Sequence, residues 1–305
     1  MIKVIEVKEL VKKYGPLAAV DNVSFYVLKG EVFGLLGENG AGKTTSLEII
    51  EGLRKMNSGH VEILGHDIKR GINSIKNKIG VQLQASAYYE FLTLKEILEL
   101  FGNFYGKSLD HEELLEMVGL KEKANSYVTQ LSSGQKQRFS IVASLINDPE
   151  IVFLDEPTTG LDPIARRNLW DIINKIRKQG KTIIITTHYM EEAEFLCDRI
   201  AIMDRGKIIA IGKTKELIEK AQNPFKINFI IRNLKNSDLA RLEKLGELIA
   251  DLGGKKNNYE IHLKTQKCVN KILAIIHELN PESVLVKSAT LEDVFVELTG
   301  KTIKE

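Results

Sequence analysis

The chain contains few cysteines, has no long apolar run and carries almost no net charge. Its two cysteines, Cys197 and Cys268, are far apart and lack the spacing of metal ligands, which indicates reduced thiols and no disulfide framework. The longest apolar stretches, such as residues 151–154, are much shorter than the ~20 residues that span a bilayer, so any membrane role must be peripheral. Forty-three Lys and Arg against 41 Asp and Glu leave a net charge of +2, which gives no argument for nucleic acid as the primary ligand.

The 305 residues are enough for a large α/β domain and a smaller appendage, and 43% hydrophobic residues can fill a buried core. Short strand-like runs separated by turn residues predict a β-rich opening over residues 3–34. Helical spacing of apolar residues predicts a helical insert at about residues 85–147. Residues 151–154 and 182–186 form continuous apolar or β-branched runs, which are typical of strands buried on both faces of a parallel sheet. The core is therefore expected to be α/β.

A weaker boundary falls at residues 221–224, after which strands and helices alternate. We expect residues 1–222 to form one domain and residues 225–305 a small α+β domain. The clearest element of the second domain is its last helix, where Thr290 and Asp293 have the spacing of a capping box. The apolar residues expected on one face of this helix are Leu291, Val294, Phe295 and Leu298.

The phosphate-loop pattern Gly-x-x-x-x-Gly-Lys-Thr lies between an expected strand at residues 32–36 and an expected helix at residues 44–50. Glycines let backbone N–H groups face phosphates, and the helix N-terminus adds favourable partial charge. Lys43 is expected to contact the β and γ phosphates of a triphosphate, and the Thr44 hydroxyl to bind Mg²⁺. The alternative is an ordinary glycine turn before a helix, which the preceding strand argues against. The loop residues expected to bind ATP are Gly37, Glu38, Asn39, Gly40, Ala41, Gly42, Lys43, Thr44 and Thr45.

Two acids follow the apolar run at residues 151–154, a costly place for carboxylates unless they meet a cation or take part in catalysis. Together with the phosphate loop, they predict that Asp155 binds Mg²⁺ through water. They also predict that Glu156 polarises the water that attacks the γ-phosphate. An acidic strand end on its own is common and is more simply explained as a helix cap or a turn.

The run Leu131-Ser132-Ser133-Gly134-Gln135 resembles the signature motif that distinguishes ATP-binding cassette (ABC) ATPases from other phosphate-loop enzymes. Ser133 stands where the usual motif has the first of two glycines, whereas Ser132, Gly134 and Gln135 match it. In this family Ser132 would donate to a γ-phosphate, and Gly134 would let a backbone approach closely. On its own, the run would be better explained as a Ser-rich helix cap.

The resemblance covers roughly residues 2–222. It implies a P-loop NTPase (RecA-like) core with a β-rich N-terminal subdomain and a helical insert, to which the small C-terminal α+β domain is added. It also implies ATP and Mg²⁺ as the ligands of the site.

Other positions resemble the remaining family motifs, and they occur in the expected order. Tyr14 is similar to the aromatic residue that stacks on adenine, although a lone tyrosine is more often a core residue. Val20 is a candidate contact beside the ribose. Gln84 resembles the glutamine that senses Mg²⁺ and the nucleophilic water, and Gln82, on the same strand face, is the alternative. His188, after an expected strand, resembles the switch histidine that contacts the γ-phosphate.

Asp162, in the run Gly160-Leu161-Asp162, resembles the loop that crosses the dimer interface of this family. In this family two cassettes close head to tail, and each signature motif completes the ATP site of the other subunit. The resemblance therefore implies a second cassette subunit as a partner, either an identical copy or a close paralogue. ATP hydrolysis would open this dimer.

Two functions are compatible with the resemblance. The first is the ATP-hydrolysing subunit of a membrane transporter, placed in the cytoplasm on the cytoplasmic face of the cell membrane, with a separate integral membrane subunit. The docking surface for that subunit, or else an internal apolar cluster, would consist of Ala87, Tyr88, Tyr89, Phe91, Leu92 and Leu94. The second is a soluble ABC ATPase that acts on ribosomes or nucleic acid. Neither a second cassette with a basic linker nor a long coiled coil is found, so no nucleic-acid partner is expected.

Residues 289–300 look like the tail of export-type subunits related to multidrug, antibiotic-resistance and sodium exporters, which favours export over import. An amphipathic packing helix is the alternative explanation. The membrane subunit, and not this chain, would select the cargo.

Overall fold

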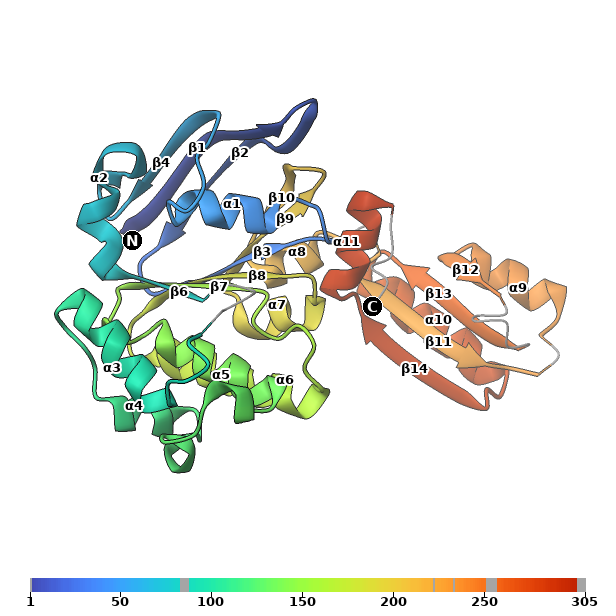
Figure 1. The fold of residues 1–305 in the computed structure, drawn as a ribbon. Coiled ribbons are helices and arrows are strands. Elements are labelled where there is room, and N and C mark those ends of the chain that lie inside the picture. Colours follow the sequence, from blue (N-terminus) through green and yellow to red (C-terminus); the bar gives the residue numbers. More distant parts are fainter. Residues whose placement is uncertain (1, 83–87, 222, 233, 251–256, 301–305) are drawn as a thin grey trace. The chain divides into compact units, whose positions relative to one another are not determined.

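The structure of the protein is a computed structural model that describes residues 2–82, 88–221, 223–232, 234–250 and 257–300 (Figure 1). The chain divides into two compact units, Met1–Thr214 and Lys215–Glu305, and each unit has its own sheets and its own core. The division falls after Thr214, whereas the sequence pattern placed the boundary after residue 222. The difference is helix α8 (Thr214–Glu219), most of which belongs to the second unit.

An antiparallel sheet opens the first unit, with the strand order β2-β1-β4-β5. Its strands are β1 (Lys3–Tyr14), β2 (Leu17–Leu28), β4 (Ser58–Ile63) and β5 (His66–Asp67). Much of β2 alternates between buried and more exposed residues, because one face of this sheet packs on the core. The β-rich opening predicted from the sequence is confirmed.

The strands of a second sheet lie in the order β10-β9-β3-β8-β7-β6. The residues predicted to bind and hydrolyse ATP follow the carboxyl ends of several of these strands. Its strands are β3 (Val32–Leu36), β6 (Ile79–Gln82), β7 (Ile151–Asp155), β8 (Thr182–Thr187), β9 (Arg199–Asp204) and β10 (Lys207–Gly212). All pairs are parallel except that of β9 with β10, and every residue of β3, β7 and β8 is buried. Because the carboxyl ends of parallel strands share one edge, the loops after β3, β7 and β8 lie close together.

Helices α1 (Lys43–Ile50), α6 (Pro163–Lys178) and α7 (Met190–Leu196) follow β3, β7 and β8 along the chain. α1 lies between the two sheets (Figure 1), and a shared core joins all three. In this core Phe25 of β2 stacks on Phe33 of β3, with ring centroids 5.1 Å apart. Helix α2 (Ile68–Ile75) and a short 3-10 helix (Lys76–Lys78) lead from the first sheet to β6. This alternation of strands and helices confirms the α/β fold class.

Three helices, α3 (Leu94–Tyr105), α4 (His111–Met117) and α5 (Ser133–Ala143), lie between β6 and β7 in sequence and pack on one another. Short 3-10 helices at Lys121–Lys123 and Val128–Gln130 join α4 to α5. Thr93 caps α3 through a capping box with Glu96. Leu94, Ile97 and Leu98 are buried along one face of α3, at the helical spacing read from the sequence.

The second unit contains an antiparallel sheet in the order β12-β13-β11-β14. Its elements run as β11 (Phe225–Ile230), α9 (Asn236–Glu243), β12 (Glu247–Ile249), β13 (Asn258–Leu263), α10 (Gln266–Glu278), β14 (Ser283–Ser288) and α11 (Leu291–Thr299). Buried residues of β11, β13 and α10 form the core. The sequence pattern missed β12, because three residues are too few to show a strand period.

The last helix begins as predicted. The Thr290 side chain accepts a hydrogen bond from the Asp293 N–H at 3.4 Å, and Asp293 accepts one from the Thr290 N–H at 2.9 Å. Leu291, Val294 and Phe295 are buried, whereas Leu298, in the last turn, is 45% exposed. Across the described ranges, no helix combines the length and the apolar character needed to cross a membrane.

Candidate nucleotide site

The phosphate loop links β3 to α1, and its glycines are required by its backbone. Gly40 and Gly42 have φ angles of 82° and 100°, which residues with side chains rarely adopt. A Cβ at Gly42 would lie 2.4 Å from the carbonyl oxygen of Ala19, and a Cβ at Gly37 would lie 2.4 Å from that of Met203. The helix begins directly after Gly42, so the free N–H groups of its first turn face the loop.

Lys43 is buried and folds back over this loop. Its Nζ donates to the carbonyl oxygens of Gly37 at 2.8 Å and Glu38 at 3.0 Å, and lies 3.1 Å from Glu156 Oε1. Burial lowers the pKa of Lys43, and the Glu156 carboxylate opposes this change. The ammonium group is thus held by an anion that a phosphate could replace. Of the other loop residues, Asn39 and Gly40 are exposed, Glu38, Thr44 and Thr45 are half-buried, and Ala41 is buried.

Asp155 and Thr44 bring two oxygen donors together beside Lys43. The Thr44 hydroxyl, in the first turn of α1, donates to Asp155 Oδ1 at 3.2 Å, and the Thr186 hydroxyl of β8 donates to the same oxygen at 2.5 Å. Burial raises the pKa of Asp155, and the two threonine hydroxyls partly oppose this. A buried carboxylate next to a hydroxyl fits Mg²⁺, which prefers oxygen ligands and would take the remainder from phosphate and water.

Glu156 directly follows β7 in a left-handed backbone conformation, with φ of 45°. Its N–H donates to Thr186 Oγ1 at 2.9 Å, and the Thr159 hydroxyl donates to its Oε2 at 3.1 Å. A residue with a side chain adopts this conformation at a cost, and the cost is tolerated only where neighbours hold it. Backbone strain of this kind is concentrated at functional sites.

Two basic groups contact the Glu156 carboxylate, one at each oxygen. Lys43 Nζ lies 3.1 Å from Oε1, and His188 Nδ1, just after β8, lies 3.2 Å from Oε2. The close contact with His188, together with the charge of Lys43, lowers the pKa of Glu156 to about 2 against the opposing effect of burial. The structure therefore brings the sequence-predicted residues Lys43, Glu156 and His188 into one cluster, with Glu156 ionised at neutral pH.

The signature residues start helix α5. Ser132 is its N-cap: the Oγ atom accepts from the Gln135 N–H at 3.3 Å, and Gln135 Oε1 accepts from the Ser132 N–H at 3.0 Å. The helix cap that was the alternative explanation is therefore present. A hydroxyl that only accepts keeps its hydrogen for a further acceptor, so capping does not exclude a contact with phosphate. Leu131 is buried, and Ser133 is exposed.

A hollow of about 380 Å³ lies at the start of α5 and α6, and it is lined by Ser132, Gly134, Gly160 and Asp162 among others. Asp162 caps α6 by accepting from two backbone N–H groups at 2.9 Å. Among the described residues, none of the phosphate loop lines this hollow. The signature motif of this chain therefore faces a different space from its own phosphate loop.

Gly134 has neither the positive φ nor the close neighbours that require glycine in the phosphate loop. A Cβ at Gly134 would lie 3.7 Å from Leu161 Cδ2 and 3.8 Å from Ala165 Cβ, which are ordinary contact distances, and its φ is not positive. Within the described part of the chain, packing does not demand glycine at this position.

The remaining predicted residues lie apart from this cluster or outside the described ranges. Tyr14, at the end of β1, is 41% exposed, and its hydroxyl accepts from Arg54 at 2.5 Å. Val20 has no exposed surface and packs in the core. Gln84 lies outside the described residues, and Gln82 is buried at the end of β6.

The sequence patterns missed Thr186, which bonds both Asp155 and the backbone of Glu156. A local signal marked its position, because two threonines end β8 after three isoleucines, but the groups that it bonds could be found only from the structure. They also missed Glu51, which is buried at the end of α1. No local signal marks Glu51, since its burial results from the packing of segments distant in sequence.

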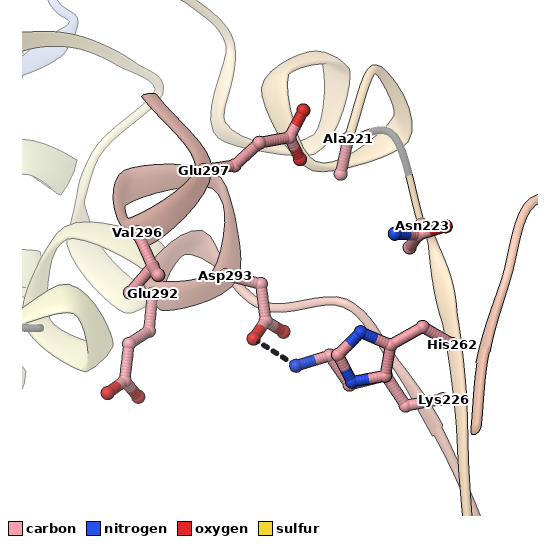
Figure 2. A pocket seen from close by; sticks show the side chains of 8 residues that line it. All are labelled: Ala221, Asn223, Lys226, His262, Glu292, Asp293, Val296 and Glu297. Carbon is pink, nitrogen blue, oxygen red and sulfur yellow. Dashed lines mark hydrogen bonds and ion pairs between the residues drawn. The ribbon is translucent and has the colours of Figure 1, made fainter. Parts of the chain in front are cut away.

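A separate hollow of about 360 Å³ lies in the second unit (Figure 2). Lys226 of β11 points into it and pairs with Asp293 of α11 at 2.5 Å. His262 of β13, beside Lys226, contacts Glu260 at 2.5 Å. The two basic side chains of this hollow are thus engaged by carboxylates of the same unit, and we assign no ligand to it.

A glycine loop before α1, acids at the end of β7 and a histidine after β8 together define a phosphate-loop ATPase on a mostly parallel sheet. The family model described as "ABC transporter" matches residues 20–159. The chain is 36% identical over 313 residues to the linearmycin resistance ATP-binding protein of Bacillus subtilis, covering 99% of this chain and 100% of that protein. It is 35% identical over 317 residues to the Nod factor export ATP-binding protein I of Ralstonia nicotianae, covering 99% and 95%. The chain belongs to the ABC transporter family.

Solved structures agree with this assignment. An ATP-binding subunit of an ABC transporter superposes with a TM-score of 0.64 and 32% identity, over 70% of this chain and 91% of that one. A dimeric ATP-binding cassette in a post-hydrolysis state, bound to ADP and Pi, gives a TM-score of 0.62 and 29% identity over 68% and 98%. The chain is therefore an ATP-binding and ATP-hydrolysing ABC subunit, as the signature run predicted, and the names of its relatives describe resistance and export. Subunits of this kind dimerise and work with membrane subunits.

Proposed function

We propose that the chain drives an exporter whose membrane-spanning subunit is a separate protein. Residues 1–222 act as the nucleotide-binding domain, with a helical subdomain at about residues 85–147, and residues 225–305 as an accessory α+β domain. The names of the relatives, which describe resistance and export, support export as the direction of transport. The place of action is the cytoplasmic face of the cell membrane, where cellular ATP is available.

The observation that carries the proposal is the cluster of Lys43, Glu156 and His188. A γ-phosphate bound at the loop attracts Lys43 more strongly than a single carboxylate does, so it draws Lys43 away from Glu156. One cause of the low pKa of Glu156 is then removed, and the carboxylate becomes a stronger base once substrate is bound. Glu156 orients and polarises the attacking water, while His188 positions the carboxylate or the γ-phosphate.

Asp155 and Thr44 are the residues that hold Mg²⁺ in this proposal, and Gln84 is a further ligand suggested by sequence alone. Bound there, Mg²⁺ neutralises charge on the phosphates during transfer. Thr186 fixes the orientation of Asp155 by donating to its Oδ1 atom. Tyr14 is the proposed stacking partner of the adenine ring.

The second half of each site comes from a second cassette, which we propose to be an identical copy. The hollow lined by Ser132 and Gly134 lacks phosphate-loop residues among those described, which supports a partner's ATP as its occupant. The described residues around Gly134 leave room for a Cβ, so a close approach from outside gives the reason for glycine at this position. Asp162 borders the same hollow and would lie at the interface.

The proposed docking surface for the membrane subunit is the exposed aromatic group before and on α3. Tyr89, Phe91 and Phe104 are 60%, 89% and 70% exposed. Tyr88, by contrast, packs its ring 5.2 Å from that of Phe139 and belongs to the helical insert itself. The alternative of an internal cluster therefore describes Tyr88, whereas Tyr89 and Phe91 are available to a partner.

The substitution Glu156→Gln tests the hydrolytic mechanism. It keeps the size of the side chain but removes the charge that polarises water, so ATP should still bind and turnover should fall about 100-fold or more. The variant should accumulate as an ATP-bound dimer. Phosphate release measures turnover, and size-exclusion chromatography with light scattering measures the dimer.

The matched control is Glu150→Gln, which makes the same change at the other end of the same strand, where the side chain is exposed. This control should turn over ATP like the unmodified chain. Undiminished turnover in Glu156→Gln would remove Glu156 from the mechanism.

A further inference from the structure

Strand β14 forms one end of the sheet in the second unit, where it pairs with β11 on one side (Figure 1). Its six-residue register with β11 is regular, without a bulge. All residues of the strand are exposed. Natural edge strands are usually protected by bulges, prolines or several lysines, and β14 has a single lysine, Lys287. A regular and largely apolar edge of this kind is suited to pairing with another strand.

The apolar residues of β14 occupy both faces of the sheet. Val284 and Val286 lie opposite the buried core residues Phe229 and Ile227 of β11. They continue the core face of the sheet, yet they are 38% and 46% exposed. Leu285 lies on the other face and is 52% exposed. The core face therefore extends beyond the part that is covered in a single copy.

The backbone of β14 also has hydrogen-bonding groups directed to its open side. The Ala289 N–H donates to the carbonyl oxygen of Pro224 at 2.9 Å, so in the regular ladder Leu285 and Lys287 direct their N–H and C=O groups to β11. The corresponding groups of Val284 and Val286 point away from β11. A strand that pairs here can bond with both valines.

We propose that β14 pairs antiparallel with β14 of a second copy of this chain, about a twofold axis at Leu285. This register places Leu285 opposite its equivalent and each Val284 opposite the other copy's Val286. The free N–H and C=O groups of Val284 in one copy then bond with those of Val286 in the other copy. All three central residue pairs are apolar. Lys287 lies opposite Ser283 and not opposite itself, so no like charges face one another.

Charge at the strand ends also favours a second copy. The antiparallel arrangement brings the Glu282 end of each strand to the Lys287 end of the other. A parallel pairing of two copies would bring like charges together instead. The same surface patch serves both copies, as a twofold interface requires.

This inference rests on the proposed pairing of two cassettes, because one short strand pair buries less surface than a stable dimer needs. Once the nucleotide-binding parts are joined by ATP, the two C-terminal units belong to one assembly and their effective concentration rises. Pairing of β14 is therefore expected in the ATP-bound dimer and not in the separated chains. The accessory unit would stabilise the ATP-bound dimer, and the pairing of β14 would depend on whether ATP is bound.

Disulfide cross-linking of the full chain tests the register. We would introduce Leu285→Cys into a chain carrying Glu156→Gln, with Cys268→Ser to remove the half-buried thiol. Directly opposed residues that do not share hydrogen bonds have Cα atoms about 4.5 Å apart, within disulfide range. With ATP, the cross-linked dimer should form at least about tenfold faster than without ATP.

The matched control is Ile249→Cys in the same background, because Ile249 is 37% exposed on β12, the other edge of the same sheet. This control should not cross-link faster with ATP. A second test mixes Val284→Cys chains with Val286→Cys chains, which should cross-link to each other faster than either does to itself.

The outcomes separate the two proposals. If light scattering shows no ATP-dependent dimer, the proposed pairing of cassettes fails, and this inference fails with it. If the dimer forms but Leu285→Cys cross-links no faster than Ile249→Cys, β14 pairing alone is refuted. A cross-link from Leu285→Cys to a different protein in membranes, in place of a second copy, would also refute it.

Discussion

At residue 51 the chain buries a carboxyl group close to the proposed nucleotide site. Glu51 is 4% exposed, and neither of its carboxyl oxygens has a partner among the described residues. Burial, with a smaller contribution from the negative charge of Asp155, raises the pKa of Glu51 to about 8. The group is therefore largely protonated in the folded protein at neutral pH, although it is ionised in the unfolded chain.

This raised pKa predicts the pH dependence of stability. Between about pH 4.5 and pH 8 the folded state keeps a proton that the unfolded state releases, so stability falls as the pH rises. The loss between pH 5 and pH 8 should be about 3 kcal/mol from this residue. Glu51→Gln should remove this loss and make the chain more stable at pH 8. Urea unfolding of the first unit at both pH values measures it.

Glu150→Gln serves as the control, because Glu150 is exposed and has a carboxyl group outside the core. Its unfolding should keep the pH dependence of the unmodified chain. Equal pH dependence in Glu51→Gln and the unmodified chain would contradict the assignment.

Single residues differ in how far the sequence could place them. Lys43, Asp155 and Glu156 follow from short patterns, because strand ends and a glycine loop fix where their side chains lie. Thr186 and Glu51 required the structure, because their contacts join segments distant in sequence. Val20 shows the opposite case: a position in a family pattern did not reveal that the core buries it completely.

At the scale of the element, the starts of α1 and α5 use glycine for different reasons. Gly42 is required inside the chain, both by its φ of 100° and by the carbonyl oxygen of Ala19 at 2.4 Å from a Cβ. Gly134 has room for a Cβ, with its nearest neighbour at 3.7 Å. The two positions should therefore respond differently to the same substitution.

Gly134→Ala should leave thermal stability within about 0.5 kcal/mol of the unmodified chain, because the added methyl group meets only ordinary contacts. ATP binding by one chain should be retained, while turnover should fall at least about tenfold if a partner's ATP approaches this residue. Gly42→Ala is the comparison and should lose ATP binding itself. Calorimetric titration with ATP and phosphate release separate the two effects, and normal turnover in Gly134→Ala would contradict the partner contact.

The aromatic residues before α3 should also divide into two groups. Phe91→Asp should fold normally and keep basal ATP turnover, because the side chain is 89% exposed, but it should lose stimulation by the membrane subunit. Tyr88→Asp should destabilise the helical insert by about 2 kcal/mol, because a charge replaces a ring packed against Phe139 and Phe101. Thermal unfolding measures the stability of both variants, and phosphate release in the presence of the co-purifying membrane protein measures stimulated ATP turnover. A large loss of stability in Phe91→Asp would show that Phe91 is a packing residue and not part of a docking surface.

Elements were predicted well where a local signal is strong. The capping box of α11 and the apolar runs of β7 and β8 could be read directly, because each needs only neighbouring residues. β12 could not be read, because a three-residue strand is too short to show a period. Helical spacing also did not indicate that Leu298 is exposed while the other apolar residues of α11 are buried.

At the scale of the whole molecule, the two groups of residues proposed to form a catalytic site lie in different places on one chain. Lys43 and Glu156 lie in one cluster, while Ser132 and Gly134 line a hollow that holds none of the described loop residues. If the halves meet only between chains, a defect in one half can be complemented by a partner with a defect in the other half. If they met within a chain, no complementation would occur.

Mixing two inactive variants distinguishes these cases. A Lys43→Ala chain has a defective loop but an intact signature motif, and a Gly134→Asp chain has the reverse. In an equal mixture half of the dimers contain one chain of each kind, and one of their two sites is intact. Turnover should therefore recover to about one quarter of that of the unmodified protein if the sites act independently. Either variant alone is the control, and a mixture no more active than these controls would place each complete site within a single chain.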